Sequence, residues 1–270
     1  LDVPPGVSQP APLVLMFHGD GTRASDQGKT MIKVTRFQQL GRKEGFVTAF
    51  PNSFNGGWED GRAHPFRPPK GVDDVAFVEA MIADISTRTA IDPNRIYAAG
   101  MSNGGFFANR LACERTQTFA AYANVVGGMP AEFACTPAGP APMLLIASTK
   151  DPFVPYEGGP VDDKKGSGGQ MLAQVHNQTF WRTHNACQGE PTTKQLTDVD
   201  PKDRSTVQSD RWTGCSGGSE VWSLTVRDAG HTWPGGPQYA PVLMIGTVNR
   251  DIDATQQIWD FFSAHTNASR

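Results

Sequence analysis

The sequence predicts an α/β protein, in which a mostly parallel β-sheet is covered by helices on both faces. Two patterns support this prediction: short apolar runs alternate with helical patterns along the chain, and most of these runs are continuously apolar rather than alternating. Continuous runs are typical of strands that are buried on both faces, as they are in parallel sheets between helices. Because no internal repeat or linker-like segment divides the 270 residues, we expect a single domain over residues 1–270.

Six apolar runs are expected to form the strands of the sheet. In chain order they cover residues 13–17, 46–50, 95–99, 122–126, 143–148 and 221–226. Repeated alternation of strands with helices implies right-handed crossovers between parallel neighbours.

Five helical patterns lie between and after these runs. The clearest covers residues 74–85, where the apolar side chains form one stripe and Asp73 or Asp74 is placed to cap the helix. The other patterns cover residues 30–44, 104–112, 170–184 and 254–265. Residues 157–169 are Gly-rich and charged and are interpreted as a surface loop, and residues 189–214 lack apolar periodicity and are interpreted as a long irregular excursion.

The composition is that of a globular chain with many loops. Hydrophobic residues make up 38% and charged residues 19%, and the formal net charge is −3. This balance excludes a disordered chain and gives no electrostatic footprint for nucleic acid or an anionic bilayer. No apolar run approaches the roughly 18 residues that a transmembrane helix needs, so we expect no membrane partner. The 29 Gly and 21 Pro exceed average usage and indicate shaped loops of the kind that bind or catalyse.

The four cysteines show no C-x-x-C motif, and no His lies at zinc-ligand spacing from them, so we expect no metal site. An even count without a metal pattern favours two disulfides in an oxidising compartment. A bond between Cys187 and Cys215 would close the irregular excursion, and one between Cys113 and Cys135 would tie a helix to the loop after the next strand. Three connectivities remain possible.

Two segments match the pattern G-x-S-x-G, at residues 100–104 and 214–218. A nucleophilic Ser in this pattern needs a buried strand before it and a helix after it. Ser102 follows the apolar run 95–99 and precedes a helical pattern, whereas Ser216 follows polar residues and leads directly into a strand. Ser102 is therefore the candidate nucleophile, and Ser216 is expected in a loop.

A Ser hydroxyl is a weak nucleophile unless a base takes its proton and an acid holds that base. After a nucleophile turn of this kind the partners follow in the order acid, then His, on loops after later strands. Asp151 follows the run 143–148, and His231 follows the run 221–226. Asp-Pro alone indicates only a turn, and a lone His is more often structural than catalytic. The hypothesis of a catalytic triad therefore rests on two facts together: the three residues occur in the expected order, and each follows a predicted strand.

The first strand ends in a Gly-rich turn that contains Asp20. Residues 19–24 also match the G-x-G-x-x-A pattern of dinucleotide sites, but the second strand ends without the acidic residue that holds the ribose. Residues 28–30 lack the preceding Gly of a phosphate loop. The turn fits a different role, in which the backbone N–H groups of Asp20 and Asn103 donate to an oxyanion.

Two tryptophans lie in loops near these candidates. Trp233 comes two residues after His231, and Trp58 lies in the Gly-rich segment 55–59. Both are candidates for the wall of a substrate pocket; the competing interpretation is a Trp that covers the edge of the core.

On these motifs the chain resembles the secreted esterases of the α/β-hydrolase fold that include feruloyl esterases, acetyl xylan esterases and polyhydroxybutyrate depolymerase-like enzymes. The matching segments span nearly the whole chain and cover residues 17–19, 71–75, 91–97, 100–105, 151–156 and 230–235. The resemblance implies the α/β-hydrolase fold, with Ser102 as nucleophile, His231 as base and Asp151 as its orienting acid. It also supports the disulfides Cys113–Cys135 and Cys187–Cys215.

The resemblance implies a secreted serine carboxylic-ester hydrolase, extracellular or periplasmic, that works through an acyl-enzyme without metal or organic cofactor. Its substrate would be a small-molecule or polymeric ester: a feruloyl or acetyl ester of plant polysaccharide, or a polyhydroxyalkanoate-type polyester or oligomer. Asn103 stands where the family often has a small residue, and residues 147–150 replace a frequent His-Gly pair, so the pocket is expected to differ. The alternatives are a non-catalytic binding protein of the same fold and a nicotinamide-dependent oxidoreductase, and the sequence carries no signal for the oligomeric state.

Overall fold

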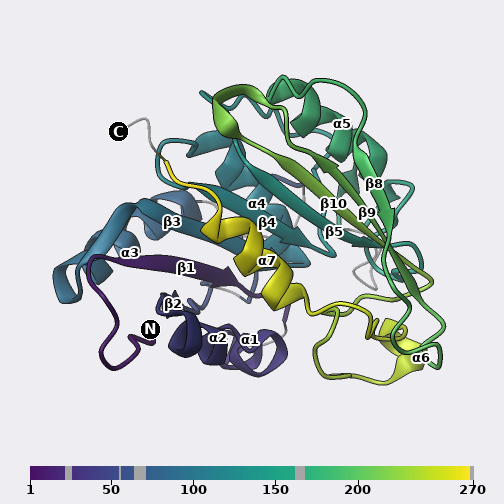
Figure 1. Ribbon diagram of the computed structural model, residues 1–270, viewed down its shortest axis with the longest axis horizontal. Coiled ribbons are helices and arrows are strands. Elements are labelled where there is room, and N and C mark those ends of the chain that lie inside the picture. Colours follow the sequence, from purple (N-terminus) through teal and green to yellow (C-terminus); the bar gives the residue numbers. More distant parts are fainter. Residues whose placement is uncertain (22–25, 55, 64–70, 162–167, 268–270) are drawn as a thin grey trace.

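The computed structural model describes residues 1–21, 26–54, 56–63, 71–161 and 168–267. They form an eight-stranded sheet with the strand order β2-β1-β3-β4-β5-β10-β9-β8 (Figure 1). Neighbours from β2 to β10 pair in parallel, and β9 and β8 continue the sheet antiparallel. The strands are β1 (Ala11–Phe17), β2 (Val47–Ala49), β3 (Ile91–Met101), β4 (Ala121–Val125), β5 (Met143–Ser148), β8 (Thr192–Gln195), β9 (Thr206–Trp212) and β10 (Val221–Arg227).

Helices cover both faces of this sheet, which confirms the predicted fold class. Side chains of α1, α2 and α7 share one buried cluster with the sheet, and side chains of α3, α4 and α5 share a second cluster on the opposite face. The helices are α1 (Gln27–Thr35), α2 (Phe37–Glu44), α3 (Asp74–Arg88), α4 (Asn103–Glu114), α5 (Gln174–His184), α6 (Val242–Ile245) and α7 (Ala254–Ser263).

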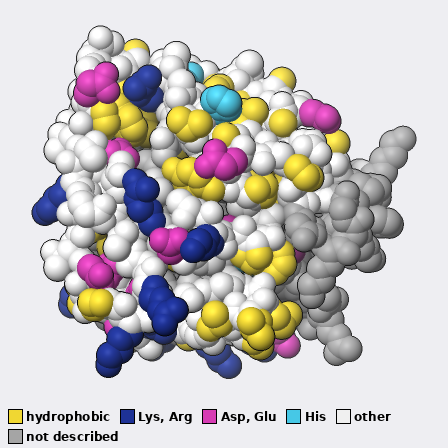
Figure 2. Space-filling view, turned by 90° about the vertical axis from the view of Figure 1, so that its right-hand side faces the viewer, with side chains coloured by type: hydrophobic (Ala, Val, Ile, Leu, Met, Phe, Trp, Pro, Cys, Tyr) yellow, Lys and Arg dark blue, Asp and Glu magenta, His cyan; other side chains and the backbone are white. Residues whose placement is uncertain are grey.

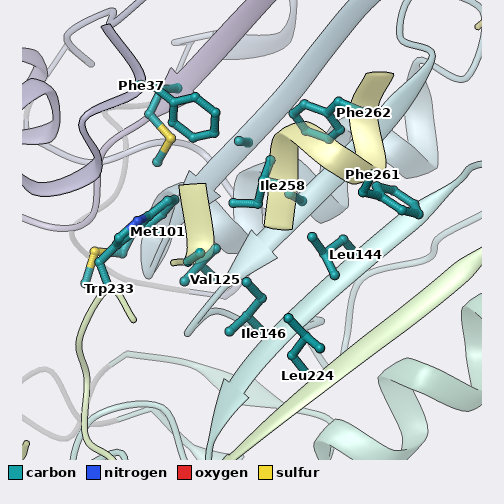
Figure 3. Close-up of a cluster of buried hydrophobic side chains, with 14 of the residues drawn as sticks. Phe37, Met101, Val125, Leu144, Ile146, Leu224, Trp233, Ile258, Phe261 and Phe262 are labelled. Atoms are coloured by element: carbon teal, nitrogen blue, oxygen red, sulfur yellow. The ribbon is translucent and has the colours of Figure 1, made fainter. Parts of the chain in front are cut away.

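Strand β1 shows why the apolar runs are continuous. All seven of its residues are buried, and successive side chains point to opposite faces. Val14 and Met16 join the cluster beneath α7, and Leu13 and Leu15 join the cluster on the α3–α4 side. Figure 3 shows the first of these clusters, in which side chains of the sheet strands meet those of α7. Both faces of the strand therefore need apolar residues, and the period-two alternation disappears.

The helix predicted for residues 30–44 is two helices, because the chain breaks at Arg36. Arg36 has φ 58° and ends α1 while it begins α2. Its guanidinium Nη2 donates to the carbonyl of Gly235 at 3.0 Å and to Asp253 Oδ2 at 2.8 Å. The break therefore anchors this helical region to the C-terminal segment, through contacts with residues about 200 positions away that a local pattern does not reveal.

The helix predicted to begin at residue 170 begins at Gln174 instead. Residues Gln170–Met171 form strand β7, which pairs with β6 (Gly159–Pro160). The segment 157–169, interpreted as a loop, therefore contributes one strand of a small hairpin, and its residues 162–167 lie outside the described part of the chain.

The segment 189–214 is not the irregular excursion that was expected. It contains β8 and β9, which pair with each other and extend the sheet from β10. All four residues of β8 are exposed, so this edge strand carries no apolar pattern that the sequence could reveal. The structure has disulfides between Cys187 and Cys215, at the base of this arm, and between Cys113 and Cys135, as expected. None of the helices described in the structure is long and apolar enough to cross a membrane.

Candidate active site

Ser102 occupies a sharp turn between the last residue of β3 and the first residue of α4. Its backbone has φ 58° and ψ −123°, a conformation that L-residues rarely adopt. The turn is fixed by the Ser102 N–H, which donates to the carbonyl of Val125 at 2.9 Å. A Cβ at Gly100 would overlap the backbone of Gly104, and a Cβ at Gly104 would overlap the carbonyl groups of Phe17 and His18. The two glycines of the motif are therefore required by the close approach of the backbone.

Asp151 and His231 are in direct contact. His231 Nδ1 lies 2.7 Å from Asp151 Oδ2, and the other carboxylate oxygen accepts the N–H groups of Phe153 and Val154 at 2.8 and 2.9 Å. The His231 backbone is also held, because its carbonyl accepts the hydroxyl of Tyr239 at 2.5 Å. The His231 side chain is 9% exposed and the Asp151 side chain is 1% exposed. A carboxylate at Nδ1 selects the tautomer in which Nε2 carries the lone pair.

The sheet order brings the three loops to one edge. Strands β3, β4, β5 and β10 are neighbours and run parallel, so their carboxyl ends meet there. Ser102 follows β3, Asp151 comes three residues after β5, and His231 comes four residues after β10. The carboxyl ends of these strands point to the right in Figure 1, and Figure 2 views that side, where small groups of hydrophobic side chains lie among charged ones. Open α/β sheets bind ligands at this edge.

The turn after β1 lies directly against Ser102. A Cβ built on Gly19 would lie 3.0 Å from the Ser102 Cβ. The buried ring of His18 holds this turn: Nδ1 donates to the carbonyl of Gly19 at 2.7 Å, and Nε2 accepts the N–H of Ser53 at 3.1 Å. Because N–H and C=O point in opposite directions across a trans peptide, fixing the Gly19 carbonyl also fixes the direction of the Asp20 N–H. Residues 22–24 of the G-x-G-x-x-A match lie outside the described part of the chain.

Trp58 does not form an exposed pocket wall, contrary to expectation. It is 0% exposed, it stacks on Phe107 with ring centroids 5.3 Å apart, and it meets Phe17 edge-on at 5.2 Å. Its indole N–H donates to the carbonyl of His18 at 3.0 Å. Trp58 therefore supports the turn before Asp20 from within the protein.

Trp233 also lies in the interior, so the expectation that it lines a substrate pocket is wrong. It is 0% exposed and belongs to the buried cluster of Figure 3, where its ring packs edge-on against Phe37 at 6.2 Å. The indole N–H is satisfied by Thr255 Oγ1 at 3.0 Å. The interpretation as a Trp that covers the core is the one that the burial supports.

Sequence reasoning missed a buried polar network beneath the site. The side chain of Asn103 donates to Asp60 Oδ2 at 2.5 Å, and Asp60 is paired with Arg62 at 2.6 Å. Asp74, 3% exposed, accepts the N–H of Glu59 at 2.7 Å. The sequence offered no signal for these contacts, because Asp60 and Arg62 lie 40 or more residues before Asn103 in a loop without periodicity. Among the described residues no group of three or more His, Cys, Asp or Glu side chains could hold a metal ion.

Both the sequence and the fold are similar to those of known proteins. Residues 33–136, less than half of the chain, match the prolyl oligopeptidase family. A Nocardia uniformis subsp. tsuyamanensis protein named as an esterase, NocK, is 27% identical over 266 residues, which cover 95% of this chain and 75% of that protein. Feruloyl esterase B of Piromyces equi is 32% identical over 163 residues, and poly(3-hydroxyalkanoate) depolymerase C of Paucimonas lemoignei is 26% identical over 129 residues.

These last two matches cover 59% and 47% of this chain but only 29% and 30% of the relatives, so the chain spans less than a third of their length. An acetyl xylan esterase from Aspergillus awamori has the same fold, with a TM-score of 0.65 at 12% identity over 97% of this chain and 92% of that one. The chain thus has the fold of this esterase, and its sequence is similar to those of proteins named as feruloyl esterase, acetylxylan esterase and poly(3-hydroxyalkanoate) depolymerase.

Proposed function

We propose that this chain is a secreted serine carboxylic ester hydrolase in which Ser102 is the nucleophile, His231 the general base and Asp151 the acid that orients His231. The observation that carries the proposal is the 2.7 Å contact between His231 Nδ1 and Asp151 Oδ2, on loops at the sheet edge where the Ser102 turn also lies. The carboxylate holds the Nδ1–H tautomer and stabilises the imidazolium that forms when Nε2 takes a proton.

The reaction proceeds in two halves. As Ser102 Oγ bonds to the ester carbonyl carbon, His231 Nε2 takes the hydroxyl proton, and collapse of the tetrahedral intermediate expels the alcohol, which His231 protonates. Water then gives a proton to His231 and adds to the acyl group on Ser102. The second intermediate releases the carboxylic acid, and the proton returns to Ser102 Oγ.

The negative charge on the carbonyl oxygen is met by two backbone donors, the N–H groups of Asp20 and Asn103. Gly19, next to Asp20, approaches Ser102 closely, and Asn103 begins the 12-residue helix α4. A helix N-terminus carries positive partial charge and adds to the stabilisation of an oxyanion. Removing one such donor typically costs on the order of 10²- to 10³-fold in rate.

Two substrate classes follow from the relatives. One is aryl or acetyl esters on plant polysaccharide, and the other is 3-hydroxyalkanoate polyesters and their oligomers; both are handled by the same acyl transfer. Secretion is supported by the disulfides Cys113–Cys135 and Cys187–Cys215, because disulfides persist in oxidising compartments.

Hydrolysis by the purified chain tests the proposal. The panel is p-nitrophenyl acetate, methyl ferulate, acetylated xylan and hydroxybutyrate oligomers, with a prolyl p-nitroanilide because the prolyl oligopeptidase family matches residues 33–136. We expect ester hydrolysis that falls by about 10⁴-fold or more in Ser102→Ala and in His231→Ala.

The matched control is Ser216→Ala, since Ser216 stands in the second G-x-S-x-G match but lies exposed at the start of a short 3₁₀ turn. That variant is expected to keep the wild-type rate. Wild-type protein that hydrolyses none of the esters, or Ser102→Ala that hydrolyses them at the wild-type rate, would contradict the proposal.

A further inference from the structure

A short segment, residues 58–62, in which Trp58 and Asp60 are buried, contacts Asn103 at the start of α4, next to Ser102; we call this segment the strap. Its first residue, Trp58, touches both segments that carry the proposed oxyanion donors. The indole N–H of Trp58 donates to the carbonyl of His18 at 3.0 Å, two residues before Asp20. The backbone N–H of Trp58 donates to Asn103 Oδ1 at 2.6 Å, and the Trp58 carbonyl accepts from Asn103 Nδ2 at 3.1 Å.

The Asn103 side chain is thus bound on three sides, because Nδ2 also donates to Asp60 Oδ2 at 2.5 Å. Asn103 is 1% exposed. An amide side chain that accepts one bond and donates two has little freedom to rotate, and its backbone is held with it.

An ion pair between Asp60 and Arg62 holds the strap in place. Asp60 accepts two bonds from Arg62, from Nε at 2.9 Å and from Nη2 at 2.6 Å, and both side chains are 6% exposed or less. Arg62 Nη1 donates to the carbonyl of Gly168 at 2.9 Å, and its guanidinium lies 4.2 Å from the centre of the Phe106 ring. Both Arg62 bonds end on Asp60 Oδ2, the oxygen that also accepts from Asn103 Nδ2, and hydrogen bonds between charged groups are stronger than those between neutral ones.

The middle of the strap is held by its backbone. The Glu59 N–H donates to Asp74 Oδ2 at 2.7 Å, and the Glu59 carbonyl accepts from Arg110 Nη1 at 2.8 Å. The backbone of the strap is therefore bonded to residues of both α3 and α4. The strap is thus bonded both to the turn after β1 and to the start of α4.

We propose that the strap sets the spacing between the backbone N–H groups of Asp20 and Asn103, with Trp58, Asp60 and Arg62 as positioning residues for the oxyanion site. Trp58 bridges the two donor segments, and the Asp60–Arg62 pair fixes Trp58 by holding Asn103. This inference rests on the proposed ester hydrolysis and adds the residues that tune its transition state. A shift of about 1 Å in such donors is expected to cost about 100-fold in rate.

The test is Asp60→Asn, which keeps the size of the side chain and removes the charge that pairs with Arg62. We expect kcat for p-nitrophenyl acetate to fall about 10- to 100-fold with KM nearly unchanged. The inhibition constant of a trifluoromethyl ketone, whose adduct with Ser102 puts an oxyanion at the same place, is expected to rise by the same factor. Inhibition by the product acid, which forms no tetrahedral adduct, is expected to stay at the wild-type value.

Asp92→Asn is the matched control. The substitution breaks an ion pair in which Arg95 Nε lies 2.7 Å from Asp92 Oδ2. This pair lies near the start of β3, whereas Ser102 follows the end of that strand. Because this pair is more exposed than Asp60–Arg62, we expect a smaller fall in Tm, with kcat and trifluoromethyl ketone binding unaltered.

Trp58→Phe is the second variant, which keeps an aromatic ring but removes the N–H that reaches His18; we expect the same loss of kcat and of trifluoromethyl ketone binding. The proposal is overturned if either folded variant lowers Tm while trifluoromethyl ketone binding stays at the wild-type value. It is also overturned if neither variant folds, since the strap is then an element of folding rather than of positioning. Wild-type protein without ester hydrolysis refutes the proposed function itself, a different result from either of these.

Discussion

Asp74 places a carboxyl group in the interior of the protein, at the first turn of α3. It is 3% exposed, and Oδ2 accepts the N–H of Glu59 at 2.7 Å. Burial, together with the neighbouring carboxylates of Asp73 and Asp60, raises the pKa of Asp74 from 3.8 to about 6. The folded protein therefore binds this proton more tightly than the unfolded chain does, and stability depends on pH.

The stability that the protonated Asp74 contributes is fully present below about pH 4 and is lost as the pH rises through about 6. Asp74→Asn keeps an acceptor for the Glu59 N–H and cannot ionise. We therefore expect the Tm of the variant, measured relative to the wild type, to rise between about pH 4.5 and about pH 7.5. Thermal unfolding across this range measures the difference.

Asp84→Asn, an exposed position on the same helix, serves as control for the loss of one negative charge. A Tm difference for Asp74→Asn that stays constant or falls with rising pH would contradict this explanation of the buried carboxyl group.

Among single residues, the sequence indicated the candidate site residues that follow strands. It did not indicate the buried residues that hold the site from the interior. Ser102, Asp151 and His231 could be chosen because each stands just after an apolar run, and strand ends are marked in a sequence. Asp60, Arg62 and the side chain of Asn103 could not, because Asn103 reaches Asp60 across 43 residues and Arg62 reaches Gly168 across 106 residues, and no spacing rule marks such contacts. Trp58 and Trp233 were placed wrongly because a Trp in a Gly-rich loop reads the same whether it faces a pocket or the core.

The arm formed by β8 and β9 is closed at its base by a disulfide. Cys187 and Cys215 close a segment of 28 residues in which β8 is fully exposed. Cys215 precedes the start of β10, whereas His231 follows the end of that strand, so the bond lies at the opposite end of β10 from the candidate site.

We expect the double variant Cys187→Ser/Cys215→Ser to lose about 3 kcal/mol of unfolding free energy, from the greater freedom of the unfolded chain. Hydrolysis of p-nitrophenyl acetate at temperatures where the variant is folded should remain at the wild-type rate. Denaturant unfolding and initial rates on the same sample measure both. Loss of hydrolysis in folded protein would show that the arm, despite its position, shapes the site.

Helices and strands could be predicted where burial leaves a pattern in their own sequence. They could not be predicted where the element is exposed or is set by distant contacts. The strands β1, β4, β5 and β10 lie within a few residues of the predicted runs because both of their faces are buried. Strand β8 has no buried face, and the break at Arg36 depends on Gly235 and Asp253, so neither leaves a pattern in its own segment.

At the scale of the whole molecule, one sheet is shared by two cores. The cluster under α1, α2 and α7 and the cluster under α3, α4 and α5 both take side chains from β1, β3, β4 and β5. Loss of either core therefore exposes the strands that support the other. We propose that residues 1–270 form a single cooperative domain.

Differential scanning calorimetry is expected to show one unfolding transition whose van't Hoff and calorimetric enthalpies agree. The disulfides should be left intact, since partial reduction mixes populations. Two resolved transitions, or a calorimetric enthalpy well above the van't Hoff value, would mean that the two sides of the sheet unfold separately.

The central claim is that Ser102 is a nucleophile activated by the His231–Asp151 pair, and covalent labelling tests it most directly. A fluorophosphonate probe followed by peptide mapping is expected to give stoichiometric modification at Ser102, absent in Ser102→Ala and strongly slowed in His231→Ala. Modification at another Ser such as Ser216, or no modification of protein that hydrolyses p-nitrophenyl acetate, would contradict the assignment.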